Sequence, residues 1–202
     1  MKIVLIGIQG SGKGTQARIL QDKYGFKILE MGGEFRKIIQ SGTELGIKIK
    51  EVINSGNQVN DELGKAVMEK AILENLGENI VYDAFLRNER NKEVLNRLIP
   101  DYKVIYFDLP ETEAKKRLLG RMYDKETGET FQAGILTNPK NGNTLIKRAD
   151  DEEQAIIQRI KSFYDLTMPI VEELRKEGKI IEIDANGNID EIALRIKEKL
   201  GL

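Results

Sequence analysis

The sequence has 202 residues and contains no cysteine, no histidine and no tryptophan. The absence of cysteine excludes disulfide bonds, and the absence of both cysteine and histidine excludes the usual structural zinc sites. The same absences exclude a histidine base and a cysteine nucleophile from catalysis.

The chain also lacks an excess of charge of either sign, because 32 Lys and Arg residues face 33 Asp and Glu residues and the net charge is −1. This balance argues against a general nucleic-acid or membrane surface, whose signature is clustered basic charge. No apolar run is long enough to cross a bilayer, and the N-terminus does not resemble a signal peptide. We therefore expect one domain that acts in the cytoplasm, with neither nucleic acid nor membrane as a partner.

The most specific pattern lies in the first fifteen residues. An apolar, β-branched run over residues 2–6 is followed at once by Gly7-Ile8-Gln9-Gly10-Ser11-Gly12-Lys13-Gly14-Thr15. A buried strand, a glycine-rich turn with a lysine and then a helix form the layout of a phosphate-binding loop. The glycines let backbone N–H groups converge on one anion, and the helix points its positive end at the same place. The pattern predicts a nucleotide site, with Lys13 reaching the β- and γ-phosphates. It suits phosphoryl transfer, in which positioning and charge stabilisation supply most of the rate.

Apolar β-rich runs alternate with helical patterns along the rest of the chain. Strands are predicted at residues 2–6, 27–29, 80–83, 104–108 and 179–183. Because these strands are almost continuously apolar, the alternation predicts an α/β fold in which a parallel sheet is covered by helices on both faces. A helical pattern over residues 156–174 contains Met168-Pro169, where we expect a break. Ligands of such sheets bind at the carboxyl ends of the strands.

Two segments interrupt this alternation. Residues 31–58 predict a small helical insert that is rich in glycine. Residues 122–147 are polar, with hairpin-type turns at Thr127-Gly128-Glu129 and Asn141-Gly142-Asn143. We interpret both segments as mobile flaps on a core formed by residues 1–30, 59–121 and 148–202, because a long loop inside a compact domain is usually functional.

Several motifs beyond the first loop resemble the adenylate kinase family, in the family's order and over the whole chain. The segment Gly12-Lys13-Gly14-Thr15-Gln16 matches that family rather than the general phosphate loop, in which Ser or Thr follows the lysine directly. The other motifs are the segments 32–36, 56–62, 83–87 and 145–151, together with Arg117, Arg121 and Arg159. The resemblance implies a five-stranded parallel sheet with a P-loop NTPase core. It also implies a monomer that catalyses ATP + AMP ⇌ 2 ADP with Mg²⁺.

The resemblance also implies the roles of individual residues, and the charge of two nucleotides brought tip to tip agrees with it. Their repulsion is best cancelled by permanently charged guanidinium groups. The implied catalytic residues are Lys13, Arg87, Arg121, Arg148 and Arg159. The implied ATP-binding residues are Gly10, Ser11, Gly12, Lys13, Gly14, Thr15, Arg117, Arg121 and Asn186, with the adenine between Arg121 and the loop 185–187. The implied monophosphate-binding residues are Met31, Gly32, Arg36, Val59, Ala84, Arg87, Asn91, Arg148 and Arg159. Asp83 is expected to hold the water shell of Mg²⁺.

The sequence departs from the family pattern mainly where the monophosphate base is expected. Met31 stands in place of a threonine, Ala84 in place of a glycine and Asn91 in place of the glutamine that reads adenine. The segment from Arg87 to Asn91 also resembles UMP/CMP kinases, so a pyrimidine or broad monophosphate kinase is an alternative. Asn88 could instead serve as a helix N-cap. A third alternative is a nucleotide-binding sensor without catalysis, motivated by the changed base pocket.

The segment 122–147 resembles the long lid of the family but offers neither of that lid's usual stabilising sets. Some relatives carry four zinc ligands there and others a His/Ser/Asp/Thr network, whereas this chain has neither Cys nor His. We expect a metal-free lid that is stabilised by packing and hydroxyl hydrogen bonds of Tyr123, Thr127, Thr130 and Phe131.

Overall fold

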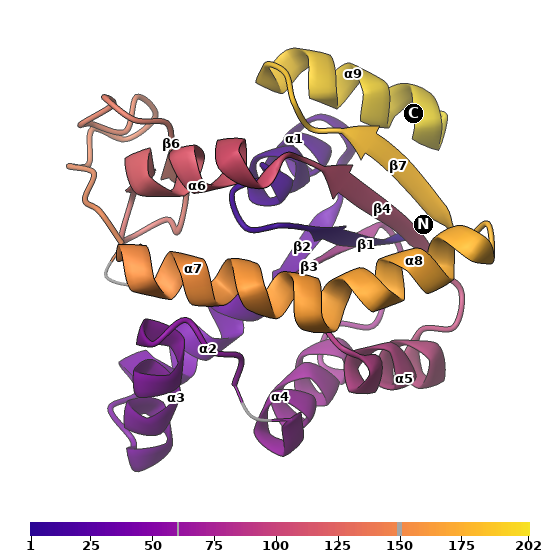
Figure 1. The fold of residues 1–202 in the computed structure, drawn as a ribbon, viewed down its shortest axis with the longest axis horizontal. Helices are drawn as coiled ribbons and strands as arrows, with labels where there is room; N and C mark the ends of the chain where they lie inside the picture. The colour runs from indigo at the N-terminus through magenta and orange to yellow at the C-terminus, as the bar shows by residue number, and fades with distance from the viewer. Residues whose placement is uncertain (60, 149–150) are drawn as a thin grey trace.

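Five parallel strands form the central sheet of the computed structural model, which describes residues 1–59, 61–148 and 151–202 (Figure 1). The strand order is β2-β3-β1-β4-β7, and every neighbouring pair is parallel. This confirms the predicted sheet. The strands are β1 (Lys2–Gly7), β2 (Lys27–Glu30), β3 (Ile80–Asp83), β4 (Lys103–Asp108) and β7 (Ile180–Asp184).

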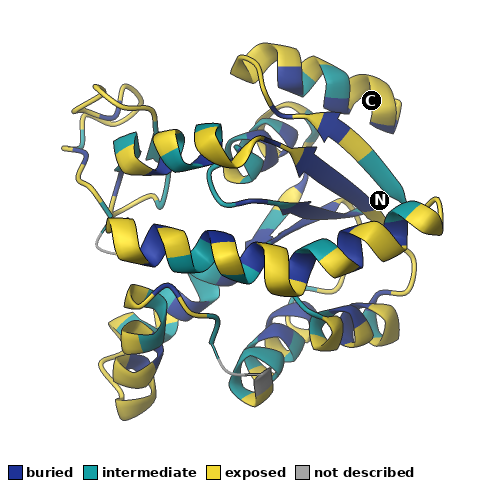
Figure 2. Ribbon diagram, in the orientation of Figure 1, coloured by how far each residue is buried: buried dark blue, intermediate teal, exposed yellow. Residues whose placement is uncertain are grey.

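The middle strand β1 is buried over most of its length (Figure 2). Its residues Ile3 to Ile6 are at most 1 % exposed, as the continuous apolar run predicts for a strand covered on both faces. In the register, Leu5 of β1 lies beside Asp83 of β3 and Ile6 lies beside Tyr106 of β4. The loop that follows β1 therefore leaves the sheet at its centre, next to the end of β3.

Helices cover both faces of the sheet (Figure 1). The helices α1 and α9 pack against each other on one face, and the rod formed by α7, η1 and α8 crosses the other face together with α4 and α5. Burial of apolar side chains on both faces gives the sheet its two-sided core. The helices are α1 (Lys13–Tyr24), α4 (Asp61–Leu73), α5 (Glu89–Leu98), α6 (Glu111–Gly120), α7 (Glu153–Ser162), α8 (Met168–Lys176) and α9 (Ile189–Leu200).

The expected break at Met168-Pro169 is a change of helical winding instead. One π-helical turn, η1 (Phe163–Thr167), joins α7 to α8 without interrupting the rod. Pro169 lies in the first turn of α8, directly after η1, so the N–H group that proline lacks is missing at the place where the helical winding changes. The prediction of a break was therefore wrong, although it located the irregularity to within a turn.

Two segments project from the sheet at the carboxyl ends of its strands (Figure 1). Residues 31–58 form α2 (Met31–Gln40) and α3 (Glu44–Asn54), as predicted for a helical insert. In the other segment, β5 (Met122–Tyr123) pairs antiparallel with β6 (Thr130–Phe131), and Thr137 pairs with Thr144. Both predicted hairpin turns are thereby confirmed. None of the helices in the described part of the chain is long and apolar enough to cross a membrane.

Candidate active site

The glycine-rich loop after β1 folds around the side chain of Lys13. The lysine Nζ donates hydrogen bonds to the carbonyl oxygens of Gly7 (2.7 Å) and Ile8 (2.9 Å) and to the Oγ of Ser11 (3.1 Å). Gly10 has a φ of 86°, and a Cβ there would lie 2.8 Å from the carbonyl oxygen of Ala114, so only glycine fits. Because α1 begins at Lys13, the loop combines a lysine, free backbone N–H groups and a helix N-terminus, as an anion site requires.

The half-buried Lys13 and the buried Asp83 place opposite charges beside this loop. Burial lowers the pKa of Lys13 to about 8, and the charge of Asp83 opposes that shift. Burial likewise raises the pKa of Asp83 to about 6, and the charge of Lys13 opposes it. Both groups therefore remain mainly ionised at neutral pH, and each depends on the other for that charge.

One oxygen atom of the Asp83 carboxylate is available to accept a hydrogen bond from a ligand. Its Oδ1 atom is buried and has no hydrogen-bond partner within residues 1–59, 61–148 and 151–202. Its Oδ2 atom would lie 3.6 Å from a Cβ on Gly14, so the carboxylate faces the first turn of α1. No group of three or more Asp and Glu side chains that could hold a metal ion occurs among the described residues. A single carboxylate fits a cation that is bound mainly by nucleotide phosphates and water.

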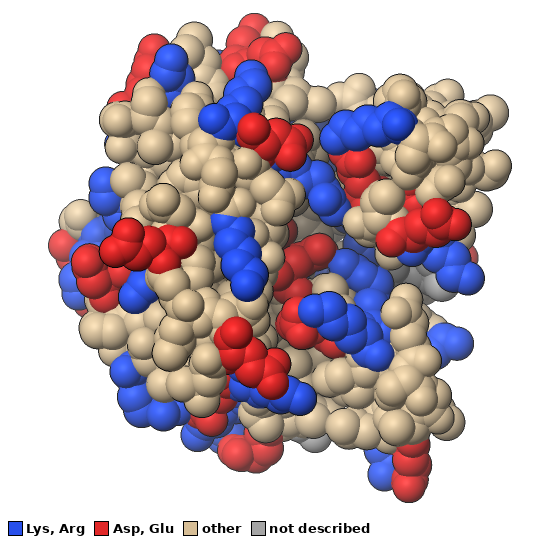
Figure 3. Space-filling model, turned by 180° about the vertical axis from the view of Figure 1, so that it is seen from behind, with Lys and Arg blue, Asp and Glu red and all other residues tan. Residues whose placement is uncertain are grey.

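The arginines predicted to surround the transferred phosphoryl group converge on this place. The pKa of Arg87 is lowered by burial, and it responds to the charges of Asp83, Arg159, Glu30 and Arg148, which come from several elements. The charge of Arg121 acts in turn on Lys13. Seen from behind, the molecule has a hollow between two lobes in which Lys, Arg, Asp and Glu side chains gather (Figure 3).

Asp151 holds two of these arginines with one carboxylate. The Nε and Nη2 atoms of Arg121 donate to its two oxygens at 2.8 and 2.6 Å, and Nη1 of Arg159 donates to Oδ1 at 3.2 Å. The side chain of Asp151 is only 4 % exposed. Arg148 lies over the ring of Tyr123, with its Cζ 5.5 Å from the ring centroid. Acidic and aromatic side chains thus interact with all five predicted cations: Asp151 binds Arg121 and Arg159, Tyr123 lies under Arg148, and the charge of Asp83 acts on Lys13 and Arg87.

The remaining predicted residues divide between two sides of this hollow. On one side, Arg117 donates to Glu113 (3.0 Å) and to the carbonyl oxygen of Ala185 (3.2 Å), which joins it to the loop containing Asn186. On the other side, Nη2 of Arg36 donates to Glu30 at 3.0 Å, and Gly32 lies in the same turn of α2. Gly14 and Thr15 occupy the first turn of α1.

The residues predicted to contact the monophosphate base line one small pocket. Its volume is about 40 Å³, room for little more than one water molecule, so the pocket must widen to admit a nucleoside. Ala84 stands in the left-handed region with a φ of 63°, which is unusual for a residue other than glycine. A wider cleft of about 440 Å³ near Glu173 is lined by Asn88 but by none of the residues that the resemblance assigns to nucleotide binding. The small pocket is lined by Met31, Phe35, Gln58, Val59, Gly64, Met68, Ala84, Phe85, Arg87, Asn88 and Asn91.

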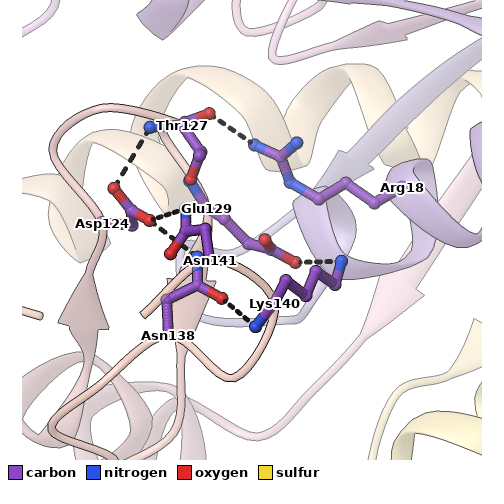
Figure 4. A network of polar contacts seen from close by, with 7 residues as sticks. All are labelled: Arg18, Asp124, Thr127, Glu129, Asn138, Lys140 and Asn141. Carbon is purple, nitrogen blue, oxygen red and sulfur yellow. Dashed lines mark hydrogen bonds and ion pairs between the residues drawn. The ribbon is translucent and has the colours of Figure 1, made fainter. Parts of the chain in front are cut away.

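Asp124 is the centre of the segment 122–147, and its network corrects the prediction for this segment (Figure 4). Its carboxylate accepts hydrogen bonds from the side-chain amides of Asn138 (2.6 Å), Asn141 (3.0 Å) and Asn143 (3.3 Å). It also accepts from the backbone N–H groups of residues 126 and 127. Of the hydroxyls expected to act here, that of Thr127 accepts one hydrogen bond from residue 129. A buried carboxylate with amide donors, and not hydroxyl bonding, therefore dominates the network.

The two halves of this network have the same local structure. One half begins at Asp124 and the other at Asn138. In each half, the side-chain oxygen of that first residue accepts from the backbone N–H two residues later. Its backbone carbonyl oxygen accepts from the N–H of a glycine four residues later. The glycines are Gly128 and Gly142, with φ values of 73° and 77°. The repeated pattern Asp-x-x-Thr-Gly and Asn-x-x-Asn-Gly was the sequence signal that could have located the network. The first turn also reaches α1, because Arg18 donates to the carbonyl oxygen of Thr127 at 3.4 Å.

Sequence reasoning missed the residues whose importance depends on a distant partner. Asp151 lay inside a recognised motif, but nothing local pairs it with two arginines. Gln58 gave no signal until its position in the base pocket was known. Asn88 is the N-cap of α5, which confirms the capping interpretation. Asn60, Ala149 and Asp150, which fall within two of the motifs, lie outside the described residues.

Comparison with known proteins gives one consistent family. A family model described as "Adenylate kinase" matches residues 5–179. The adenylate kinase of Chloroherpeton thalassium is 33 % identical over 215 residues, covering 99 % of this chain and 98 % of that protein. The adenylate kinase of Borreliella burgdorferi is 33 % identical over 205 residues, covering 97 % and 96 %. The adenylate kinase of Hydrogenobaculum sp. is 31 % identical over 212 residues, covering 99 % of this chain and all of that protein.

Proposed function

The chain belongs to the adenylate kinase family, and we propose that its five assembled cations transfer the γ-phosphoryl group of ATP to AMP in the reversible reaction ATP + AMP ⇌ 2 ADP. As a member of that family it is a nucleotide phosphotransferase. The proposal includes a monomer that acts in the cytoplasm on free nucleotides. The proposal also assigns the residues that bind ATP, those that bind AMP and those that stabilise the transferred phosphoryl group.

The convergence of Lys13, Arg87, Arg121, Arg148 and Arg159 is the observation that carries the proposal. Phosphoryl transfer needs little covalent help from the protein and depends on positioning and on cancelling charge. Two of the arginines are already fixed by Asp151 in the structure, so little side-chain entropy is lost when a phosphate arrives. The acceptor is a phosphate oxygen, so no general base is required.

ATP is proposed to bind with its phosphates on the loop from Gly10 to Thr15 and its adenine beside the loop 185–187. Arg117 supports this side because it already contacts the carbonyl oxygen of Ala185. Asp83 would hold Mg²⁺ through water, since its buried Oδ1 atom can accept a hydrogen bond from a bound water. When bound with ATP, Mg²⁺ neutralises part of the phosphate charge.

AMP is proposed to bind under the segment 31–58, with its phosphate on Arg36 and Arg87 and its base in the pocket of Met31, Val59, Ala84 and Asn91. We assign the segment 31–58 as the monophosphate-binding insert and 122–147 as the lid, on the core of residues 1–30, 59–121 and 148–202. Closure of both would exclude water, which otherwise competes as the phosphoryl acceptor.

The test is the initial rate with ATP and Mg²⁺ and each of AMP, UMP, CMP, GMP and dTMP. We expect a clear preference for AMP. Lys13→Ala and Arg87→Ala should each lower kcat/KM by about 10³-fold or more, because each removes a charge next to the transferred group. Lys199→Ala on the exposed side of α9 is the matched control and should leave the rate unchanged.

The outcomes separate the alternatives. A preference for UMP or CMP would show that Met31, Ala84 and Asn91 redirect the base pocket toward pyrimidines. ATP binding without turnover on any monophosphate would identify a nucleotide sensor. Near-native turnover of either variant would refute the site assignment while leaving the reaction in place.

A further inference from the structure

Three side-chain amides form a chain of hydrogen bonds along the rim of the base pocket. The N–H of Arg87 donates to Oδ1 of Asn91 (3.2 Å), the N–H of Asn91 donates to Oδ1 of Asn88 (3.0 Å), and Nδ2 of Asn88 donates to Oε1 of Gln58 (3.2 Å). The chain links the segment after α3 to the start of α5. It therefore joins the two sides of the pocket that must close on a monophosphate.

The two backbone donors fix the orientation of all three amides. A backbone N–H can only donate, so the atom that it meets on Asn91 or Asn88 must be the carbonyl oxygen. The NH₂ group of Asn88 then points at Gln58, which must accept with its own oxygen. The NH₂ groups of Gln58 and Asn91 are left over, and neither has a hydrogen-bond partner in the part of the chain that the structure describes.

These two NH₂ groups belong to residues that line the pocket, whose other walls are mainly apolar side chains such as Met31, Phe35 and Met68. An apolar slot with two oriented donors binds a flat ring whose edge offers acceptors. We infer that Gln58 is a specificity-determining residue, whose amide donates a hydrogen bond to a ring-nitrogen or carbonyl acceptor on the base of the monophosphate. Asn88 is its positioning residue, because it holds the oxygen of the Gln58 amide and turns the NH₂ group toward the ligand. The inference rests on the proposed function and adds the contact that selects the base.

The experiment pairs Gln58→Leu with AMP analogues that each lack one ring acceptor: 1-deaza-, 3-deaza- and 7-deaza-AMP. Gln58→Leu should raise KM for AMP by about 3- to 10-fold with kcat retained, the size of one neutral hydrogen bond. One of the three analogues should show the same loss with the wild-type protein and no further loss with the variant, because both changes remove one bond. If UMP or CMP proves the better acceptor, 2-thio- and 4-thio-UMP replace the deaza series.

Two further variants test whether the effect comes from the donor group of Gln58 and not from a general change in this segment. Gln58→Glu keeps the oxygen that Asn88 needs but replaces the donor with an acceptor, so it should bind AMP at least as poorly as Gln58→Leu. Asn57→Leu changes the exposed neighbour, whose amide bonds Ser55, and should leave KM unchanged.

The failures are distinguishable. Losses that are additive for every analogue, or no loss with Gln58→Leu, would overturn the inference and leave the proposed kinase intact. A wild-type protein without turnover on any monophosphate would overturn the proposed function, and the inference with it.

Discussion

Ala84 follows Asp83 at the end of β3 and has a φ of 63°, a conformation in which an L side chain crowds its own backbone. Ala84 also lines the pocket that we propose for the base. Backbone strain of this kind concentrates at functional sites. The chain therefore keeps a methyl group in the pocket at the expense of stability.

Ala84→Gly should stabilise the unliganded protein by about 1 kcal/mol, because glycine adopts this conformation without strain. For a chain of this size the gain corresponds to a rise in Tm of about 2–4 °C, measurable by calorimetry. Ala66→Gly in the middle of α4 is the matched control: the same change at a helical position should destabilise by about 1 kcal/mol. Equal effects of the two variants would show that Ala84 is not strained.

The residues that we propose to bind phosphate could be selected from the sequence, whereas the partners that hold them in the structure could not. Lys13, Arg87 and Arg159 stand at fixed places in recognisable motifs, so the resemblance located them without a structure. The clamp formed by Asp151 joins residues 30 positions apart, and the amide chain from Gln58 to Asn88 also spans 30 positions. Such contacts depend on tertiary placement, about which local pattern carries no information.

At the scale of the element, strands were predicted well and irregular segments poorly. The buried strands carry an almost continuous apolar signal, so their bounds follow from the sequence. The π-helical turn η1 leaves no comparable pattern in the sequence. Pro169 predicted a break at Met168-Pro169, whereas the irregular turn lies just before it, at Phe163–Thr167. Inside the lid, polar residues spaced for turns were visible, but the convergence of three asparagines on Asp124 was not.

The attachment of the monophosphate insert depends on a close backbone contact at Gly56. A Cβ there would lie 2.4 Å from the carbonyl oxygen of Ala155 in α7, and the φ of Gly56 is 78°. Gly56→Ala should therefore displace the insert and raise KM for AMP more than KM for ATP. The expected loss of stability exceeds the roughly 1 kcal/mol of backbone strain alone.

Gly42, between α2 and α3, is the control for this prediction. Its φ is 67°, but a Cβ there meets nothing within 4 Å, so Gly42→Ala imposes the strain without the clash. Urea unfolding and steady-state kinetics of both variants check the comparison. Equal KM values for the two variants would contradict the role of the contact with α7.

The lid should depend on the charge of Asp124. Hydrogen bonds from Asn141 and Asn138 hold the pKa of this carboxyl well below its usual value of 3.8. Since the folded-state pKa is depressed, the stabilisation is fully present above pH 3.8 and is lost as the pH falls through the folded-state value. Asp124→Asn should reproduce that loss at pH 7 and increase tryptic cleavage at Lys125 and Lys140 by at least about tenfold.

Two measurements check this prediction. The side-chain NH₂ resonances of Asn138 and Asn141 should move toward random-coil positions in the variant while the signals of the sheet remain. Asp101→Asn, which changes an exposed loop carboxylate, should alter neither cleavage nor resonances. A lid that stays resistant in the Asp124→Asn variant would show that packing holds it instead.

At the scale of the whole molecule, strand and helix alternation was enough to predict a parallel sheet with its site at the carboxyl ends. Residues 31–58 directly follow the end of β2, and residues 122–147 lie between α6, which follows β4, and α7 (Figure 1). The topology does not give the side-chain contacts between these segments and the core, such as the hydrogen bond from Arg18 to the carbonyl oxygen of Thr127.

Removal of metal ions with a chelator tests whether the stability of the whole molecule depends on a structural metal. The lid is held by one carboxylate and its amide donors, so a chelator should leave the Tm of the nucleotide-free, magnesium-free protein unchanged within about 1 °C. With ATP and Mg²⁺ present, the same chelator should lower the Tm, because it removes the cation that binds with the nucleotide. A drop in Tm without nucleotide would reveal a structural metal.

The turn at Asn141-Gly142 links the fold of the lid to the chemical ageing of the protein. An asparagine amide followed by glycine is slowly lost when the glycine nitrogen attacks the side-chain carbonyl, which releases ammonia and, after hydrolysis, leaves a carboxylate. In the folded lid the N–H of Gly142 is held by the carbonyl oxygen of Asn138 at 2.9 Å, which restrains the attacking nitrogen. Each period with the lid unfolded exposes this bond, and the new carboxylate would then face that of Asp124 and hinder refolding. The fraction of molecules with a carboxylate at position 141 should therefore increase with the time that the lid spends unfolded.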